Sequence, residues 1–381
     1  MARIVVISKY PPIEGGIAAK TYWFCRALAG RGHIIHIVTN RIDADPEYSV
    51  DPYEEELQLE NITIHRPLGE IPWHIPNDRH VDMELLDCAI RVAKDIKADI
   101  IDTGYLVPYG LIGYLAGRIT GIPYLLKHGG SDVNKFMRAG LWDNLFKEVF
   151  SHASMVVTDR TNHNTLGKLS DHIRVTIPYV PDPHFYKPLR ASRQGKPILA
   201  LIGKTNYYWR HKGWHRVVDI MQQLQDDFNF MIVSQGIGLK DFRQYVDERI
   251  RGSVEWRSFV HPSKMPELLN EVDGVFMFYK DLPYPAFSNL VTEVLYCGKT
   301  VITDHTNIIK FYEGEGLALD AFFSQILSVD GDNTDAMVNK IRWHFDQNHL
   351  LDKGKHHEVA HQDYENYILK NEAAIRSLCK Q

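Results

Sequence analysis

The chain lacks the patterns that mark several large classes of protein. Its 381 residues include four cysteines (Cys25, Cys88, Cys297 and Cys379), and no two of them form a CxxC pair. Scattered cysteines argue against a disulfide framework or a zinc ribbon and are typical of free thiols in a reducing compartment. No apolar run is long enough for a spanning helix or a signal peptide, so we expect a cytoplasmic protein.

Strong charge and a dinucleotide fingerprint are also missing. Lys and Arg number 43 against 48 Asp and Glu, which gives a net charge of -5 and no electrostatic reason to expect nucleic acid. No GxGxxG spacing follows the first strand, which argues against an NAD-dependent enzyme. An apolar content of 44% over this length is ordinary for a globular protein with two cores.

What the chain does have is a repeated alternation of strands and helices. The expected strands are residues 3–8, 33–39, 62–66, 99–102, 122–127, 154–158 and 173–177, then 197–202, 228–233, 273–278 and 300–303. The expected helices are residues 18–30, 81–96, 108–120, 137–151, 213–224, 239–250, 288–297 and 355–378. This order predicts an α/β protein with two Rossmann-like, doubly wound parallel sheets. Four prolines between Pro178 and Pro188 predict the linker between them.

Ligands of doubly wound sheets bind outside the carboxyl ends of the strands. With two such domains, the natural site is the cleft between them. The loops expected to line it are residues 9–16, 103–107, 128–134, 203–212 and 279–289.

The most informative segment is PAFSNLVTEVLYCGKTVIT, residues 285–303. Phe287, Ser288 and Asn289 open a helix, where unpaired backbone N–H groups make a ready anion site. Glu293 stands one turn inside this helix. An anion site beside a carboxyl group suits a nucleotide, with phosphates at the N–H groups and ribose hydroxyls at the acid.

This segment resembles the donor-binding signature of retaining glycosyltransferase family 4, which has the GT-B fold. Glu293 matches the second acid of the signature, whereas Pro285 stands in place of the first acid. The missing acid normally contacts hydroxyls of the donor sugar. In order of preference, the donor is a deoxy- or amino-sugar, Asp281 substitutes for the acid, or activity is reduced.

Two loops of the first half extend the resemblance. Gly15 and Gly16 allow close approach of backbone to an anion, or form an ordinary strand-to-helix turn. They resemble the family's glycine-rich loop near the donor phosphates and the acceptor. His128 ends a strand in HGGSD, similar to the family's His-Gly-(Ser/Thr)-Asp motif, whose histidine contacts the transferred sugar. This chain has one glycine more than the motif, so whether Asp132 takes the position of the motif's aspartate stays open.

A basic loop follows the first strand of the second half. Lys204, Arg210 and Lys212 precede a helix opened by Gly213 and suit a diphosphate leaving group. Lys204 takes the place where the family usually has arginine, and Lys212 matches the lysine of its Lys-Gly pair. The aromatic residues of this loop line the sugar or acceptor pocket, or they cover a solvent-facing edge: Tyr207, Tyr208 and Trp209.

The resemblance implies a metal-independent, retaining glycosyltransferase of the GT-B fold, acting in bacterial glycan or glycoconjugate biosynthesis. It implies an acceptor domain at residues 1–180, a donor domain at residues 181–361, and a final helix, about residues 362–381, that packs back on the first domain. The expected donor is a nucleotide-diphosphate sugar, with UDP favoured, and no cofactor is needed. The acceptor is a glycan, a lipid-linked sugar or a small molecule, and peripheral membrane contact is allowed.

These roles fall on specific residues. The expected catalytic residues are His128, Lys204 and Lys212. The expected donor-binding residues are Gly15, Gly16, Lys204, Lys212, Ser288, Asn289, Leu290 and Glu293. The expected sugar or acceptor contacts are Asp132, Tyr207, Asp281 and Phe287.

Two other functions stay open. A sugar-nucleotide epimerase also has two Rossmann halves, but the sequence offers no convincing acid–base pair for one. The hypothesis of a degenerate, non-catalytic binding subunit is supported by Pro285, which replaces the first acid of the signature. Two DxD strings, at residues 43–45 and 330–332, are interpreted as solvated loop acids. The amphipathic segment 135–150 is interpreted as a core-facing helix in preference to a membrane-surface helix.

Overall fold

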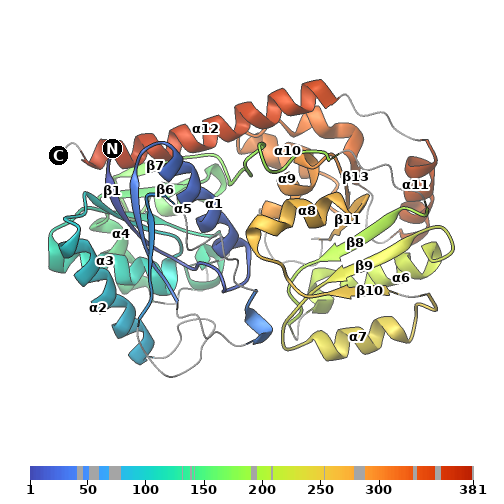
Figure 1. Cartoon of the computed structure of the whole chain (residues 1–381), viewed down its shortest axis with the longest axis horizontal. Helices are drawn as coiled ribbons and strands as arrows, with labels where there is room; N and C mark the ends of the chain where they lie inside the picture. Colours follow the sequence, from blue (N-terminus) through green and yellow to red (C-terminus); the bar gives the residue numbers. More distant parts are fainter. Residues whose placement is uncertain are drawn as a thin grey trace. The chain divides into compact units, whose positions relative to one another are not determined.

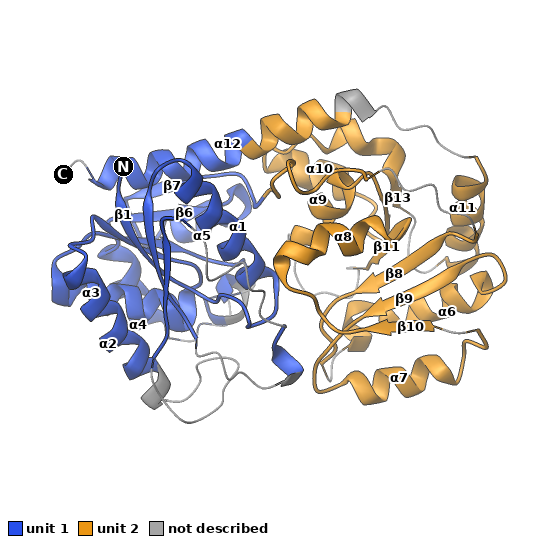
Figure 2. Ribbon diagram, viewed as in Figure 1, with its two compact units in different colours: residues 1–179, 365–381 blue, residues 180–364 orange. Residues whose placement is uncertain are grey.

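The structure is a computed structural model. It describes residues 1–40, 46–50, 60–67, 79–130, 132–137, 140, 142–189, 195–206, 209–252, 254–278, 288–328, 333–347 and 353–379. Its contacts divide the chain into two compact units (Figure 2). Unit 1 is Met1–Tyr179 with Glu365–Gln381, and unit 2 is Val180–Tyr364.

Unit 1 contains a seven-stranded parallel sheet in the order β3-β2-β1-β4-β5-β6-β7 (Figure 1). Its strands are β1 (Arg3–Ile7), β2 (Ile34–Val38), β3 (Ile62–His65), β4 (Ile100–Thr103), β5 (Tyr124–Lys127), β6 (Met155–Thr158) and β7 (Ile173–Val175). Its helices are α1 (Gly16–Gly30), α2 (Arg79–Asp95), α3 (Leu111–Thr120), α4 (Asp143–Ser151) and α5 (Arg160–Leu166). All four residues of β4 and of β5 are buried, which explains why their sequences do not alternate between apolar and polar residues.

Unit 2 contains a six-stranded parallel sheet in the order β10-β9-β8-β11-β12-β13. Its strands are β8 (Ile198–Ile202), β9 (Asn229–Val233), β10 (Val254–Arg257), β11 (Gly274–Met277), β12 (Thr300–Thr303) and β13 (Ile326–Ser328). Its helices are α6 (Trp214–Leu224), α7 (Leu239–Asp247), α8 (Met265–Asn270), α9 (Asn289–Tyr296), α10 (Ile308–Gly314) and α11 (Thr334–Asp346). The long helix α12 (Lys353–Cys379) begins in unit 2 and ends in unit 1.

The prediction of two doubly wound parallel sheets is confirmed. Strands β10 and β13 were not predicted, nor were the helices α5, α8, α10 and α11, which are 13 residues long or shorter. The helix expected over residues 137–151 starts only at Asp143, after Gly140 adopts a φ of +66°. As expected for a core-facing helix, α4 buries Phe146, although Trp142 before it is half exposed.

The strand order fixes where a ligand can bind in each unit. In both sheets the chain runs outward from one central strand in one direction and then returns to continue on its other side. This reversal lies between β1 and β4 in unit 1 and between β8 and β11 in unit 2. Ligands of open α/β sheets bind at such switch points, beyond the carboxyl ends of the strands.

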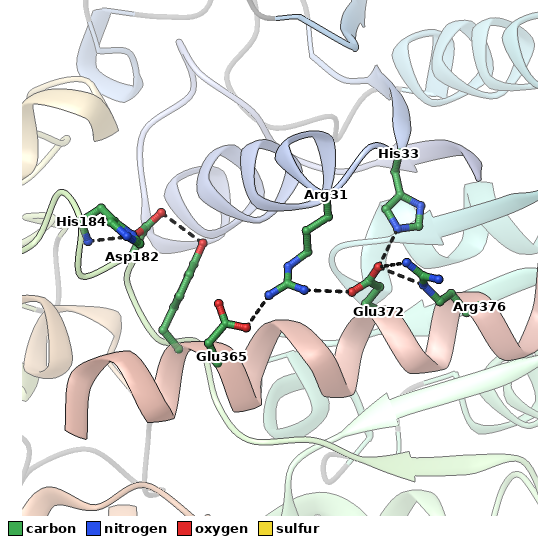
Figure 3. Close-up of polar contacts among 8 residues, drawn as sticks. Arg31, His33, Asp182, His184, Glu365, Glu372 and Arg376 are labelled. Atoms are coloured by element: carbon green, nitrogen blue, oxygen red, sulfur yellow. Dashed lines mark hydrogen bonds and ion pairs between the residues drawn. The ribbon is translucent and has the colours of Figure 1, made fainter. Parts of the chain in front are cut away.

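The end of α12 is tied to the start of the chain by one buried carboxylate (Figure 3). Glu372, which is 4% exposed, accepts hydrogen bonds through Oε1 from His33 Nε2 at 3.0 Å and from Arg376 at 2.6 Å. Its Oε2 lies 3.4 Å from Arg31, and Arg31 also pairs with Glu365. Burial raises the pKa of Glu372, but hydrogen bonds from His33 and Arg376 outweigh it and leave the pKa below its usual value.

We expect Glu372→Gln to destabilise unit 1 at pH 7 by about 2 kcal/mol, because the cations around it lose a charged acceptor. For a unit of this size, that corresponds to a Tm lower by about 5 °C. Because the folded pKa is lowered, the carboxylate stabilises the fold above the unfolded pKa of 4.5, and this stability is lost as the pH falls. The Tm difference between the variant and the wild type should therefore shrink from pH 7 to pH 4.

Glu365→Gln is the matched control, since this acid lies on the same helix but its side chain is 51% exposed. We expect its effect to stay within about 0.5 kcal/mol. Equal Tm losses for the two variants would contradict the central role of Glu372.

Candidate functional site

Glu293 is a buried acid at the carboxyl edge of the unit 2 sheet. It lies on α9, which ends at Tyr296 with Cys297 as its C-cap, before Gly298 takes a φ of +71°. The side chain is 5% exposed. Burial raises its pKa to about 8, and a hydrogen bond with Tyr186 opposes this increase. At neutral pH the group is therefore mostly a neutral carboxylic acid, which can both donate a hydrogen bond to a hydroxyl and accept one.

The start of α9 differs from the expectation of unpaired amides. The Ser288 N–H donates to the hydroxyl of Tyr312 at 3.1 Å, and that hydroxyl lies 3.2 Å from the Ser288 carbonyl oxygen. The expectation that Ser288 presents an unpaired N–H is therefore wrong, because a tyrosine 24 residues later in the chain packs against it. Asn289 and Leu290 form the first turn of α9, as predicted.

The structure brings the two predicted lysines of unit 2 together. Lys212 Nζ donates to the Lys204 carbonyl oxygen at 2.5 Å and lies 5.1 Å from the ring centroid of Trp214. Arg210 lies instead 3.5 Å from Asp241 and stacks on the Trp209 ring at 4.0 Å. The loop after β8 therefore holds the Lys212 ammonium against the Lys204 backbone and the Arg210 guanidinium against α7.

Trp209 belongs to the core. It is fully buried, and its indole N–H donates to Asp241 at 2.8 Å. The alternative that Trp209 lines a sugar pocket is therefore wrong. The predicted sugar or acceptor contacts Tyr207, Asp281 and Phe287 lie outside the described residues. So do Tyr208, Pro285, which stands in place of the first acid, and the acids at residues 43, 45, 330 and 332.

Strand order predicts that the lysine loop and the start of α9 lie at the same edge of the unit 2 sheet. The lysines follow β8, and α9 follows the connection after β11. These two strands pair directly, from Leu199 with Gly274 onward, and they flank the switch point of the sheet. The sequence analysis missed a buried ion pair at the same edge, in which Arg216 of α6 contacts Asp304 at 2.7 Å. The signal for it was an acid placed directly after strand β12.

In unit 1, His128 follows β5 as predicted, but both of its ring nitrogens are engaged. The Gly130 N–H donates to Nδ1 at 3.0 Å, so Nε2 carries the proton in the assigned tautomer and donates to Thr158 Oγ1 at 2.7 Å. Burial lowers the pKa of His128 to about 4. The ring is therefore neutral, and a sugar hydroxyl would have to compete with Thr158 for its N–H.

Asp132 organises the loop after His128. Its side chain is fully buried and accepts the amide N–H groups of Leu106, Gly129 and Val133, each at 2.9 to 3.0 Å. Gly129 cannot carry a side chain there, because a Cβ atom would lie 2.7 Å from the ring of Tyr105. The extra glycine thus lets the loop fold tightly around Asp132, and the carboxylate is occupied by backbone.

Of the two glycines predicted to precede the first helix, Gly15 does so, whereas Gly16 is the first residue of α1. Gly15 is the residue before the helix, with a φ of +112°, and a Cβ atom there would meet open space. The glycine is therefore required by backbone conformation and not by crowding.

A buried charge cluster beside this loop was not predicted. Lys127 Nζ lies 2.5 Å from Asp102, and both side chains are almost fully buried. Burial, together with the positive charge of Lys127, lowers the pKa of Lys20 on α1 to about 8. The sequence feature that could have predicted this cluster is a charged residue, Asp102 or Lys127, in each of two buried strands.

Comparison with known proteins identifies the architecture. Residues 18–160 match a family model described as glycosyl transferase 4-like. A sucrose-phosphate synthase from Thermosynechococcus elongatus superposes with a TM-score of 0.70, at 16% identity and over 99% of both chains. The chain has the GT-B fold. Anabaena HepE in complex with UDP-glucose gives a TM-score of 0.64, at 14% identity and over the full length of both chains.

Proteins outside the transferases share this fold. A Listeria monocytogenes protein described as a candidate UDP-N-acetylglucosamine 2-epimerase gives a TM-score of 0.61 at 12% identity, over 98% of this chain and 95% of its own. No curated protein matches the chain in sequence.

The described residues contain no group of three His, Cys, Asp or Glu side chains already arranged to hold a metal ion. In the same part of the chain, no helix combines the length and apolar character needed to cross a bilayer.

The raised pKa of Glu293 predicts a slope in stability with pH. Because the folded acid holds its proton up to about pH 8 and the unfolded acid only to 4.5, stability should fall as the pH rises between these values. The slope is at most about 1.4 kcal/mol per pH unit. We expect Glu293→Gln to flatten the dependence of Tm on pH from 5.5 to 8, with Glu267→Gln, an exposed acid of α8, as control. Parallel curves for Glu293→Gln and the wild type would contradict the pKa assignment.

Proposed function

We propose that the protein is a retaining glycosyltransferase that moves a sugar from a nucleotide-diphosphate sugar, with UDP favoured, to an acceptor hydroxyl. The observation that carries this proposal is Glu293, a buried and neutral acid behind a helix start at the switch point of the unit 2 sheet. The match to the glycosyl transferase 4-like model and the fold shared with UDP-glucose-bound HepE support it.

Unit 2 is the proposed donor half. Glu293 bonds the ribose hydroxyls, and Tyr186 holds the acid in place from the segment that follows the unit boundary. Lys204, Lys212 and the first amides of α9 bind the diphosphate. A carboxylic acid that stays neutral can approach the ribose without repelling the adjacent phosphates.

The proposed chemistry proceeds on one face of the sugar. The bond from C1 to the diphosphate oxygen breaks, and its electron pair goes to that oxygen. The acceptor oxygen bonds to C1 on the same face and gives its proton to the departing phosphate oxygen. The two lysines and the helix dipole stabilise the charge that grows on the diphosphate, so the transfer needs no metal.

Unit 1 is the proposed acceptor half. Gly15 and Gly16 give its first loop close access to a ligand, and His128 contributes a neutral N–H toward the sugar once it is released from Thr158. Asp132 acts through the loop that it organises. Direct roles for Tyr207, Asp281 and Phe287 remain predictions of the sequence. The acceptor is a glycan, a lipid-linked sugar or a small molecule in bacterial surface-glycan synthesis.

The second candidate function is a sugar-nucleotide epimerase, which the fold shared with the Listeria protein favours. Incubation of UDP-N-acetylglucosamine without acceptor separates the two functions. An epimerase converts it to its C2 epimer, whereas a transferase releases UDP slowly by hydrolysis.

We expect one nucleoside diphosphate, UDP before GDP, dTDP or ADP, to stabilise the wild type in the absence of metal. At one hundred times its Kd it should add about 2.7 kcal/mol, or about 5 °C or more in Tm. Glu293→Ala should lose this shift, and Glu267→Ala should keep it. No shift with any of the four nucleotides would favour the degenerate binding subunit.

We expect Lys212→Ala to lower kcat/KM for UDP release from the donor sugar by about 100-fold, because it removes a cation from the leaving group. Lys240→Ala, a surface lysine of α7, should behave as the wild type. The assay is run with EDTA throughout. Unchanged turnover in Lys212→Ala would place the diphosphate elsewhere, and loss of wild-type turnover on adding EDTA would refute a metal-free transfer.

A further inference from the structure

Two histidines on the first turns of α12 share one face of the helix. His357 and His361 are four residues apart, and their Nε2 atoms lie 3.1 Å from each other. Two nitrogens bound to one tetrahedral zinc ion, each at 2.0 to 2.1 Å, are about 3.3 Å apart. The pair is therefore within a few tenths of an ångström of the spacing that a chelated metal ion requires.

A third histidine comes from the proline-rich segment. The ring of His184 stands edge-on to that of His361, with the ring centroids 5.0 Å apart. Its Nδ1 lies 2.8 Å from Asp182 Oδ1 (Figure 3). The other oxygen of Asp182 accepts the hydroxyl of Tyr364 at 3.1 Å.

This contact with Asp182 matters for the chemistry of His184. When a carboxylate accepts the Nδ1–H of an imidazole, the lone pair lies on Nε2, and the ring is held in one tautomer. Histidines that bind metal ions usually have such a carboxylate partner behind them. Asp182 thus prepares the Nε2 atom of His184 as a ligand.

We propose that His357 and His361 bind a divalent transition-metal ion, with His184 as the third ligand and Asp182 as its orienting partner. Imidazole ligands suit Zn²⁺, Ni²⁺ and Cu²⁺ and disfavour Mg²⁺ and Ca²⁺. The three histidines are not yet arranged as a complete ligand set among the described residues. His184 completes the set by a movement of its ring that keeps Nδ1 on Asp182 and turns Nε2 toward His361, which its 70% exposed side chain permits.

The site has a consequence for Glu293. A metal ion held by all three histidines would tie the segment around His184 to α12, within unit 2. Tyr186 follows two residues later and hydrogen-bonds to Glu293. Occupancy of the site therefore restrains the segment that holds the buried acid. The metal ion takes no part in the proposed transfer, and the inference does not depend on that function.

The test is calorimetric titration of the EDTA-treated, dialysed full chain with ZnCl2. We expect one ion per wild-type chain, and at least about tenfold weaker binding for His357→Gln, His361→Gln and His184→Gln. Asp182→Asn should weaken binding about tenfold to a hundredfold, through the orientation of His184. His356→Gln is the matched control, since this histidine lies on the same turn of α12 but stacks on Phe322 at 4.9 Å.

Electron paramagnetic resonance with one equivalent of Cu²⁺ gives a second measurement that does not depend on affinity. We expect hyperfine coupling to three imidazole nitrogens in the wild type and to two in His184→Gln. Equal affinities for the wild type and His361→Gln would overturn the site. Equal affinities and spectra for the wild type and His184→Gln would overturn the third ligand, and a loss in His356→Gln as large as in His361→Gln would indicate non-specific binding.

Discussion

Unit 1 depends on a bond between the two ends of the chain, and Glu372 makes it. The buried carboxylate on α12 meets His33 and Arg31, which connect α1 to β2. A carboxylate taken out of water is costly unless nearby cations and donors satisfy it, so the loss of a partner leaves a buried charge without compensation. The ring of Tyr367 on α12 packs against Phe24 and Tyr179, which adds apolar contact to the same junction. Residues from the last helix thereby become part of the first domain.

The two sheets follow one rule of assembly, which made much of the fold predictable. Central strands such as β1 and β8 are unbroken apolar runs, because both of their faces are buried. The sequence of β10, VEWR, is not such an apolar run, because an edge strand keeps partly exposed positions and tolerates charged residues. Strand β13 has only three residues, too few for any periodicity to be visible. Such elements become strands because a neighbouring strand offers them hydrogen bonds.

In the candidate site, too, some properties follow from the neighbouring sequence and others from residues far along the chain. Glu293 could be predicted because a helix start and a Cys-Gly turn bracket it within a few residues. Its neutral state could not, because that state is the balance between burial, which raises the pKa, and a hydrogen bond with Tyr186, more than a hundred residues earlier in the chain, which lowers it. Likewise, the neighbouring sequence predicts that His128 lies at a strand end, whereas its tautomer depends on Thr158, which belongs to another strand. Sequence patterns locate such residues, but packing decides their protonation.

Protonation in turn limits how charge can be distributed in the proposed reaction. At neutral pH, His128 is uncharged and Glu293 is mostly protonated, since burial shifts their pKa values to about 4 and about 8. The cations assigned to the leaving group, Lys204 and Lys212, therefore face no competing carboxylate from Glu293. A bound diphosphate would raise the pKa of Glu293 further, because a second negative charge nearby opposes ionisation. Binding of the donor would thus favour the neutral form of Glu293, which does not repel the donor's phosphates. The two lysines would remain available to stabilise the negative charge that develops on the diphosphate as the glycosidic bond breaks.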